Sequence, residues 1–498
     1  MNANVAGGAG RGVAGWFWLG VVAWLLGGGA WWAEARPRLP AVIGSGMVLQ
    51  RELPLTIWGW ADAGEEITVV IGENRGSART DEQGRWRVRL APMKASAEPL
   101  KMTVAGRETI ELTDILVGEV WLGSGQSNMQ MSVAAAAKGR EEVAAANFPQ
   151  VRLFLVPLVA SGTPAEDVRA GWKVCQPATV GSFSAVAYYF GRELQRELGV
   201  PVGLIASSWG GTRIEPWMAP EGFASQPDLQ REREEIAAAR ERFAKAGEPK
   251  PKHPLNSNGA ATGLYNGMIH PLAPFGIRGV LWYQGEANLA AGMRYHSLMK
   301  GLIGGWRQVW GQGDFPFLFV QLAPFAYKAK ETLLPEIWEA QAETLKVANT
   351  GMAVTTDIAT VGDIHPPNKQ EVGRRLALWA LANTYGKPLV YSGPLFEGMK
   401  VERGRIRLEF KHVGGGLVTR DAKMLTWFHI AGEDGKFVPA LATIVDSKLV
   451  VVSSPRVPKP VAVRFGWGQG AEPNLANKEG LPAAPFRTDR WTDAEMER

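Results

Sequence analysis

Strand-like and helix-like segments alternate between residues 115 and 390, and this alternation limits the possible folds more than any other feature of the chain. Ser184–Leu198 has the spacing of an amphipathic helix, which Gly199 and Pro201 stop, and Val202–Ala206 reads as the buried strand that follows. Further strand-like runs are Ile277–Tyr283, Phe317–Leu322 and Met352–Thr356. The pattern is typical of a mostly parallel sheet covered by helices, so an α/β fold is expected.

Short β-type runs flank this region on both sides. The N-terminal runs are Leu55–Trp60, Ile67–Ile71 and Trp86–Leu90, with Asp81–Gly84 read as a hairpin turn between the last two. The β pattern returns near the C-terminus, where Thr443–Val445 is expected to pair with Leu449–Val452. The expected domains are an N-terminal β-sandwich (36–113), an α/β domain (114–390) with a charged, solvated insertion at about 221–264, and a C-terminal β-rich domain (391–498).

The composition is that of an ordinary globular protein. Hydrophobic residues make up 46% and charged residues 21% of the 498 positions. The net charge is +5, and lysines and arginines are scattered among acidic residues without a basic block, so no nucleic-acid partner is expected. The 20 Trp and 59 Gly residues suit β-rich domains and sugar-contacting surfaces, although core packing is the commoner use of tryptophan.

The first residues have the pattern of an export signal. Arg11 is followed by the apolar run Gly12–Trp32 and by Ala33-Glu34-Ala35, an A-x-A cleavage site. Residues 1–35 are therefore predicted to be the signal peptide of a secreted or periplasmic protein with no stable membrane span after cleavage. An N-terminal membrane anchor is the alternative, because the apolar run approaches spanning length. The single cysteine, Cys175, excludes an internal disulfide.

Four polar or glycine-rich loops are associated with predicted strands of the α/β region. The first carries Ser127 within Gly125-Gln126-Ser127-Asn128-Met129. The other three are Ser207–Thr212, Trp282–Asn288 and Asp363–Lys369. In a parallel sheet, the loops that follow strands gather at the carboxyl edge, where ligand sites form. These loops are therefore expected to build one functional site.

Ser127 is a candidate nucleophile in this set of loops. A serine hydroxyl attacks well only when a base takes its proton, and histidine is the usual base, oriented by a carboxylate. Of the 6 histidines, only His365 follows closely after an aspartate, Asp363, in a loop at the expected edge of the sheet. The negative charge of a tetrahedral intermediate also needs hydrogen-bond donors. The candidate donors are the backbone N–H groups of Gly210 or Gly211 and the side-chain amides of Gln284 or Asn288.

Each of these residues also has a purely structural interpretation. Ser127 and Asp363 could cap the helices that follow them, and His365 could be a helix-entry residue fixed by two prolines. Metal chemistry is not expected, because the chain has no His-Glu-x-x-His motif, no cysteine cluster and no local set of histidines. No phosphate loop or dinucleotide fingerprint occurs in the required context, so no cofactor is predicted.

The motifs of the four loops resemble those of the sialate O-acetylesterase family of SGNH hydrolases. The resemblance extends from Gly46–Gln50 to Asn477–Pro482, nearly the whole chain after the predicted signal. It implies a flavodoxin-like SGNH hydrolase domain with N-terminal and C-terminal β-sandwich-like domains, which removes O-acetyl groups from sugars without a metal. It also implies the roles of single residues: Ser127 as nucleophile, His365 as base, Asp363 as acidic partner, and Ser127, Gly211 and Gln284 around the oxyanion hole.

The chain departs from the wider SGNH pattern in two ways. The acid commonly precedes the histidine by three positions, where this chain has Gly362, so Asp363 and Asp357 both remain candidates for the acid. The third loop lacks the simple Gly-x-Asn form, so the amide that completes the oxyanion hole stays open. The candidates for that hole are Gln284, Asn288, Gly210 and Gly211.

The predicted function is that of a carbohydrate O-acetylesterase, a serine carboxylic-ester hydrolase that acts on an acetylated sugar such as an O-acetylated sialate. Acetylated xylan or another plant polysaccharide is an alternative substrate, and a noncatalytic carbohydrate-binding protein is the alternative from another class. The side chains proposed to contact the sugar are Trp209, Arg213, Glu215 and Glu286. Packing or ion pairing is the structural alternative for each of them.

Overall fold

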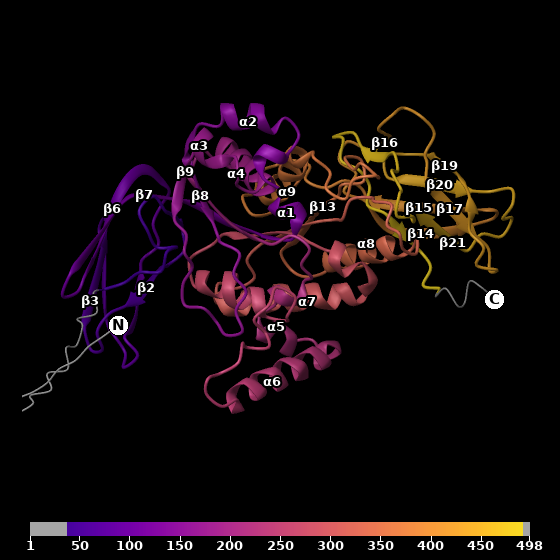
Figure 1. Cartoon of the computed structure of the whole chain (residues 1–498). Coiled ribbons are helices and arrows are strands. Elements are labelled where there is room, and N and C mark those ends of the chain that lie inside the picture. The colour runs from indigo at the N-terminus through magenta and orange to yellow at the C-terminus, as the bar shows by residue number, and fades with distance from the viewer. Residues whose placement is uncertain (1–36, 492–498) are drawn as a thin grey trace, which may run out of the picture. The chain divides into compact units, whose positions relative to one another are not determined.

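The computed structural model describes residues 37–491, and a central sheet with the strand order β13-β12-β11-β7-β10-β8-β9 organises it (Figure 1). Neighbouring strands of this order run parallel, except that β9 is antiparallel to β8. In chain order the strands are β7 (Thr109–Gly125), β8 (Phe148–Leu155), β9 (Trp172–Cys175), β10 (Val202–Ser208), β11 (Gly279–Tyr283), β12 (Phe317–Val320) and β13 (Thr350–Ala353). The predicted signal peptide, residues 1–35, lies outside the described residues. Within residues 37–491, no helix is long and apolar enough to cross a membrane.

Helices cover both faces of the central sheet (Figure 1). They are α1 (Ser127–Gln130), α2 (Gly139–Ala145), α3 (Pro177–Val180), α4 (Ala185–Leu198), α7 (Arg294–Trp310), α8 (Leu333–Thr344) and α9 (Lys369–Asn383). As the sequence predicts, α4 begins after Ser184, whose side chain accepts a hydrogen bond from the Ala187 N–H, and ends at Gly199 with a φ of 64°. Every residue of β10, β11 and β12 is buried, as expected for a sheet covered on both faces. The predicted α/β fold class is confirmed.

Strand β7 belongs to two sheets. Its first half pairs with β6 (Ser96–Ala105) and β1 (Val48–Gln50), and its second half pairs with β10 and β11 in the central sheet. The domain boundary expected between residues 113 and 114 therefore falls inside one strand. The chain crosses from one side of β7 to the other between β10 and β11, so the loops after these three strands emerge side by side. Such a crossing point is where open α/β sheets form ligand sites.

The N-terminal β region packs two small sheets together. β3 (Glu66–Ile71) pairs with β4 (Asn74–Arg79) and β6, while β2 (Leu55–Trp60) pairs with β5 (Arg85–Leu90). The sequence predicts that Asp81–Gly84 is a hairpin turn between Ile67–Ile71 and Trp86–Leu90, and this prediction is wrong. The turn joins β4 to β5, and these two strands lie in different sheets. Sequence reading missed β4 because its residues are small or polar and show no apolar alternation. The buried residues of this region share one apolar core with the central sheet.

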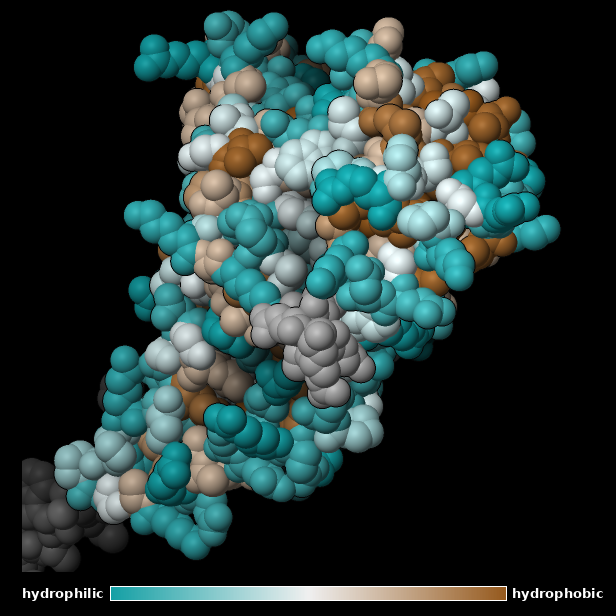
Figure 2. Space-filling view, turned by 90° about the vertical axis from the view of Figure 1, so that its right-hand side faces the viewer, coloured by the Kyte–Doolittle hydropathy of each residue, from teal (hydrophilic) through white to brown (hydrophobic). Residues whose placement is uncertain are grey.

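The C-terminal β region has an apolar core of its own, formed by buried residues such as Leu408, Ile430 and Val452. Its sheets contain β14 (Leu395–Glu402), β15 (Arg405–Lys411), β20 (Leu449–Ser453) and β19 (Leu441–Ile444); β16 (Leu417–Thr419) and β22 (Leu475–Asn477); and β18 (Val438–Pro439), β17 (Phe428–Ala431), β21 (Ala462–Phe465) and β23 (Phe486–Arg487). The predicted pairing of β19 with β20 is confirmed as antiparallel. Figure 2 shows hydrophilic and apolar residues side by side on the face that carries this region.

The charged segment between β10 and β11 projects from the α/β region as α5 (Pro220–Ala224) and α6 (Gln230–Lys245) (Figure 1). Only Ile236 and Ala239 of α6 are buried, so the rest of this helix faces solvent. The reading of this segment as a charged, solvated helix agrees with the structure.

Candidate active site

Ser127 directly follows the carboxyl end of β7 and is the first residue of α1. Gly125 has a φ of 139°, and a Cβ atom at this position would lie 2.2 Å from the carbonyl oxygen of Tyr283 on β11. Only glycine therefore allows β7 to end this close to its neighbour and turn toward α1. Ser127 itself is half-buried, so it remains open to solvent at the edge of the sheet.

His365 reaches Ser127 from the loop between β13 and α9. Its Nε2 atom lies 2.8 Å from the Oγ atom of Ser127, although 238 positions separate the two residues in the chain. With the ring proton on Nδ1, the Ser127 hydroxyl donates a hydrogen bond to Nε2. This is the contact through which an imidazole takes the proton of a nucleophilic serine. The structure thus brings together the two residues that the sequence singles out as nucleophile and base.

The two candidate acids have different partners. Asp363 is exposed, and its Oδ1 atom accepts a hydrogen bond of 2.8 Å from the backbone N–H of His365. Asp357 forms a bidentate ion pair with the buried Arg375, at 2.6 and 2.7 Å. Within residues 37–491, no carboxylate forms a hydrogen bond with Nδ1 of His365. Asp363 therefore supports the backbone of the loop that carries the imidazole, and the charge of Asp357 is engaged with Arg375.

The two candidate side-chain amides of the third loop are both engaged. Gln284 is fully buried, and its Nε2 atom lies within 3.0, 3.1 and 2.8 Å of acceptors on Gln126, Thr212 and Asn288. Asn288 in turn donates from Nδ2 to Glu215 at 3.0 Å. These contacts join the loops after β7, β10 and β11. In this arrangement both amides hold the loops together.

Backbone N–H groups beside Ser127 are the remaining donors. The N–H of Gly210 donates to Oε1 of Gln130 at 2.8 Å. A Cβ atom on Gly210 would lie 3.3 Å from Cβ of Ser127, so the second loop passes directly beside the serine. The N–H groups of Ser127 and Gly211 form no hydrogen bond with any described residue. They can therefore donate to an oxygen that carries negative charge.

A buried network lies next to the serine and consists of Lys369, Asn128 and Glu286. Lys369 donates from Nζ to Oδ1 of Asn128 at 2.5 Å, and Asn128 donates from Nδ2 to Oε1 of Glu286 at 2.5 Å. The same Nδ2 also lies 2.9 Å from the carbonyl oxygen of Ile364, the residue before His365. Asn128 therefore ties the loop of Ser127 to the loop of His365.

Burial shifts the proton equilibria of both charged groups in this network toward their neutral forms. It raises the pKa of Glu286, which hydrogen bonds and the nearby Lys369 only partly oppose. It lowers the pKa of Lys369 to about 8, against the opposing charges of Glu286 and Asp363. The Oε2 atom of Glu286 is buried and makes no hydrogen bond with the described residues. The sequence predicts that Glu286 contacts a sugar. In the structure, however, its carboxylate faces the interior of the protein.

Comparison with known proteins places this geometry in a family. A family model described as "Carbohydrate esterase, sialic acid-specific acetylesterase" matches residues 117–382. The sialate O-acetylesterase of Homo sapiens is 31% identical over 501 residues, which cover 90% of this chain and 92% of that protein, and the Rattus norvegicus enzyme is 34% identical over 415 residues, which cover 72% and 76%. The chain belongs to the sialic acid-specific acetylesterase family. A crystal structure of a carbohydrate acetylesterase from Xanthomonas citri shares 39% identity and a TM-score of 0.83, and covers 92% of this chain and 100% of that one.

The chain is accordingly an esterase, a carboxylic ester hydrolase of this acetylesterase family. The segment that matches the family model contains all four loops. Within the part of the chain that the structure describes, no group of three or more His, Cys, Asp or Glu residues could hold a metal ion.

Three further side chains of this acetylesterase lie in the region after β10: Trp209, Arg213 and Glu215. Arg213 is exposed and is anchored by Glu215 at 2.7 Å. Glu215 is itself buried and bonded to Asn288, so it serves as a support for Arg213. Trp209 is partly exposed and packs against the apolar core. Arg213 is therefore the one of these residues that has an exposed charge to offer a substrate.

Sequence reasoning missed the roles of Lys369 and Gln130. Lys369 is the first residue of α9, where the helix dipole disfavours a positive charge. This unfavourable position could have indicated from the sequence that another residue binds the lysine. Gln130 gave no comparable signal, because its contact with Gly210 joins residues 80 positions apart.

Proposed function

We propose that this esterase removes acetyl groups from a sugar by nucleophilic catalysis with Ser127 and His365. The observation that carries the proposal is the 2.8 Å contact between Ser127 Oγ and His365 Nε2 at the carboxyl edge of the sheet. His365 takes the hydroxyl proton while Oγ attacks the acetyl carbonyl carbon. The bond from that carbon to the sugar oxygen then breaks, and His365 returns the proton to the sugar oxygen. A water molecule, deprotonated by His365, attacks the acyl-enzyme and releases acetate and free Ser127.

In this mechanism the backbone N–H groups of Ser127 and Gly211 stabilise the oxyanion of the tetrahedral intermediate. The second loop passes beside the serine at Gly210, and neither N–H group has another hydrogen-bond partner among the described residues. Gln284 contributes indirectly, because its side-chain amide donates hydrogen bonds to Gln126 and Thr212 and so keeps their two loops together. Asp363 contributes by fixing the backbone of His365.

The proposed substrate is an O-acetylated sialate. The relatives described above carry the name sialate O-acetylesterase. The exposed guanidinium of Arg213, held by Glu215 in the loop after β10, suits a substrate that carries a carboxylate. Acetylated xylan has no carboxylate on its main chain, so only the sialate can form an ion pair with Arg213.

The mechanism is tested by Ser127→Ala with 4-nitrophenyl acetate as substrate. The expected result is loss of turnover with an unchanged thermal unfolding curve. Ser447→Ala changes an exposed serine of the C-terminal region and serves as the matched control with full activity. Retained hydrolysis in Ser127→Ala would overturn the mechanism.

The substrate is tested by acetate release from O-acetylated sialic acid and from acetylated xylan, with wild type and Arg213→Ala. We expect faster release from the sialate and a selective loss of that preference in Arg213→Ala. Faster release from xylan would assign the enzyme to plant polysaccharides instead. Glycan binding without turnover of any acetyl ester would favour a noncatalytic sugar-binding protein.

A further inference from the structure

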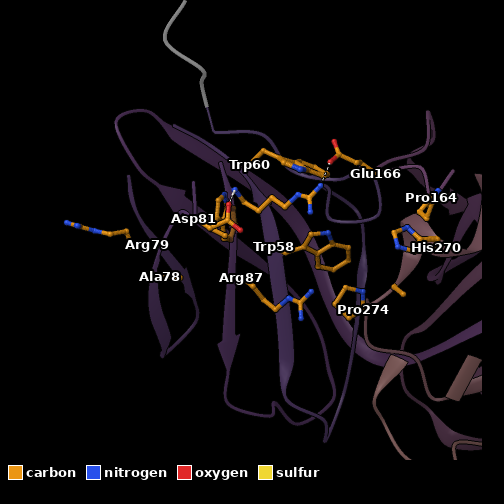
Figure 3. Close-up of a pocket in the computed structure, with 14 residues that line it drawn as sticks. Trp58, Trp60, Ala78, Arg79, Asp81, Arg87, Pro164, Glu166, His270 and Pro274 are labelled. Carbon is orange, nitrogen blue, oxygen red and sulfur yellow. Dashed lines mark hydrogen bonds and ion pairs between the residues drawn. The ribbon is translucent and has the colours of Figure 1, made fainter. Parts of the chain in front are cut away.

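A groove of about 700 Å³ lies over the outward face of the sheet formed by β2 and β5 (Figure 3). Trp58 and Trp60 alternate with buried residues along β2, so their side chains point away from the sheet core. Arg87 lies opposite Trp58 on β5. The facing wall comes from loops of the α/β region, and Figure 3 shows the Trp58 ring directed toward His270 and Pro274 on that wall.

The groove continues into a second hollow of about 610 Å³. The two hollows share Arg87, His270 and Pro274, so they form one elongated channel along the sheet. The second hollow extends to Arg89 of β5 and to Trp310 at the end of α7. Two adjoining hollows that share lining residues suit a chain of linked units better than one compact molecule.

The channel carries an excess of positive charge. Arg85 is paired with Glu166 at 2.9 Å, and Asp81 accepts hydrogen bonds from the backbone of its own turn. The remaining arginines that line the channel form neither an ion pair nor a side-chain hydrogen bond with any residue of the described part of the chain. They are Arg87, Arg89 and Arg79, of which Arg79 points its side chain away from the groove in Figure 3.

The combination of an aromatic surface with free guanidinium groups points to one kind of ligand. Arg38 covers one face of Trp60 at 4.2 Å, which leaves Trp58 as the main aromatic surface of the channel. A flat aromatic ring can pack against the C–H face of a sugar, and a guanidinium group binds a carboxylate through two parallel hydrogen bonds. A neutral sugar chain would leave the charges of Arg87 and Arg89 without partners. We propose that this channel binds an acidic oligosaccharide, with Trp58 stacked on a sugar ring and Arg87 bound to a carboxylate.

The channel lies at the opposite edge of the sheet from Ser127. His270 and Pro274 precede β11 at its amino end, whereas Ser127 lies beside the carboxyl end of that strand. β11 has five residues, which span roughly 15 Å. A saccharide in the channel therefore leaves the site of acetyl transfer empty. The channel holds an acidic polymer on the protein independently of its deacetylation.

The test uses the full chain and two unacetylated probes, hexagalacturonate and the neutral cellohexaose, in calorimetric titrations. Hexagalacturonate should bind at least about tenfold more tightly than cellohexaose, since only the former offers carboxylates to the arginines. Arg87→Ala and Trp58→Ala should each weaken hexagalacturonate binding at least about tenfold. Arg403→Ala changes an exposed arginine of the C-terminal region and should leave binding unchanged.

Two further measurements separate this proposal from the catalytic one. Ser127→Ala should bind hexagalacturonate as the wild type does, and Arg87→Ala should hydrolyse 4-nitrophenyl acetate at the wild-type rate. Thermal unfolding shows whether Trp58→Ala is folded, and the exposed Arg87 provides the second variant if it is not. Absence of hexagalacturonate binding, equal binding of cellohexaose, or unchanged binding in Arg87→Ala would each overturn the proposal.

Discussion

The proposed reacting pair, Ser127 and His365, lies on the same two segments of the chain as Asn128 and Lys369, but in the opposite environment. Glu286, the third member of the buried network, comes from the loop after β11. Asn128 directly follows Ser127, and Lys369, the first residue of α9, lies four positions after His365. Ser127 and His365 are half-buried, whereas Lys369 is fully buried and Asn128 is 1% exposed. The two segments therefore carry both the half-buried pair and two of the three residues of the buried network.

The difference indicates that the half-buried pair carries out the proposed reaction, whereas the buried network positions that pair. A nucleophile and a base must meet the substrate and exchange a proton, so they need access to solvent. Buried charged groups are costly and remain only where each has a partner, which makes their geometry rigid. The buried network is thus suited to hold Ser127 and His365 at hydrogen-bond distance, through the contacts of Asn128 with both loops.

Removing the base should have the largest effect. We expect His365→Ala to lower kcat on 4-nitrophenyl acetate by about 10⁴-fold or more, because Ser127 then has no group to take its proton. The thermal unfolding temperature should stay close to that of the wild type, since His365 is half-buried. His429→Ala, on β17 of the C-terminal region, is the control. Equal losses in both histidine variants would refute a reacting pair at this position.

Asn128→Ala should have the next largest effect, because it removes the centre of the buried network. It leaves Lys369 and Glu286 without their shared partner, so the free energy of unfolding should fall by about 2–4 kcal/mol. The loosened contact between the two loops should lower kcat by about 100-fold. Denaturant titration and steady-state kinetics measure the two effects.

The control for this variant is Asn383→Ala, which changes an exposed asparagine with only a local bond to the Trp379 carbonyl. A wild-type kcat in Asn128→Ala would show that the network does not position the reacting pair.

The pH dependence of stability should report the buried lysine. Burial lowers the pKa of Lys369 from 10.5 to about 8, so in that pH window the unfolded chain holds a proton that the folded chain has lost. The free energy of unfolding contributed by this group therefore rises as the pH increases through the window and is lowest below it. In Lys369→Met this rise is absent.

The measurement is the difference in free energy of unfolding between wild type and Lys369→Met across this window. We expect the difference to grow in favour of the wild type by up to about 3 kcal/mol as the pH rises. A difference that is flat in pH would mean that Lys369 keeps its ordinary affinity for protons.

Asp363→Ala should have the smallest effect on activity. Its carboxylate bonds to an exposed backbone N–H and not to the imidazole, so we expect kcat to fall by about tenfold or less. An acid that orients the imidazole would instead cost about 10⁴-fold. Asp357→Ala should behave differently, with a loss of up to about 3 kcal/mol in stability, because the buried Arg375 then keeps only Glu371 as a carboxylate partner. A 10⁴-fold loss of kcat in Asp363→Ala would establish Asp363 as the orienting acid.

Local sequence signals were sufficient for the fold class and for the pair Ser127 and His365. The alternation of apolar periods predicts the sheet and its helices, and the glycine-containing turn Gly125-Gln126-Ser127 at a strand end predicts that the serine projects from the edge of the sheet. The partners of the buried network lie 158 and 241 positions apart, so no local pattern indicates that Asn128 joins Glu286 to Lys369. For the same reason the sequence could not show that the amide of Gln284 is engaged with three acceptors.

The N-terminal region shows the same limit at the level of the fold. The apolar run before Ser127 predicts a strand, but a strand of 17 residues that serves two sheets has no distinct local pattern. Its first half pairs with β6, which directly precedes it, but its second half pairs with β10, whose residues lie more than 70 positions further along the chain. A boundary drawn from composition therefore cuts through β7.

The central claim is that Ser127, activated by His365, forms the covalent bond to the acyl group. The most direct measurement is mass spectrometry of the enzyme after reaction with the organophosphate paraoxon, which traps an activated serine nucleophile. We expect one diethylphosphoryl adduct on the peptide that contains Ser127, no adduct in Ser127→Ala, and strongly slowed labelling in His365→Ala. An adduct on another serine, or labelling of Ser127 at an unchanged rate in His365→Ala, would contradict this claim.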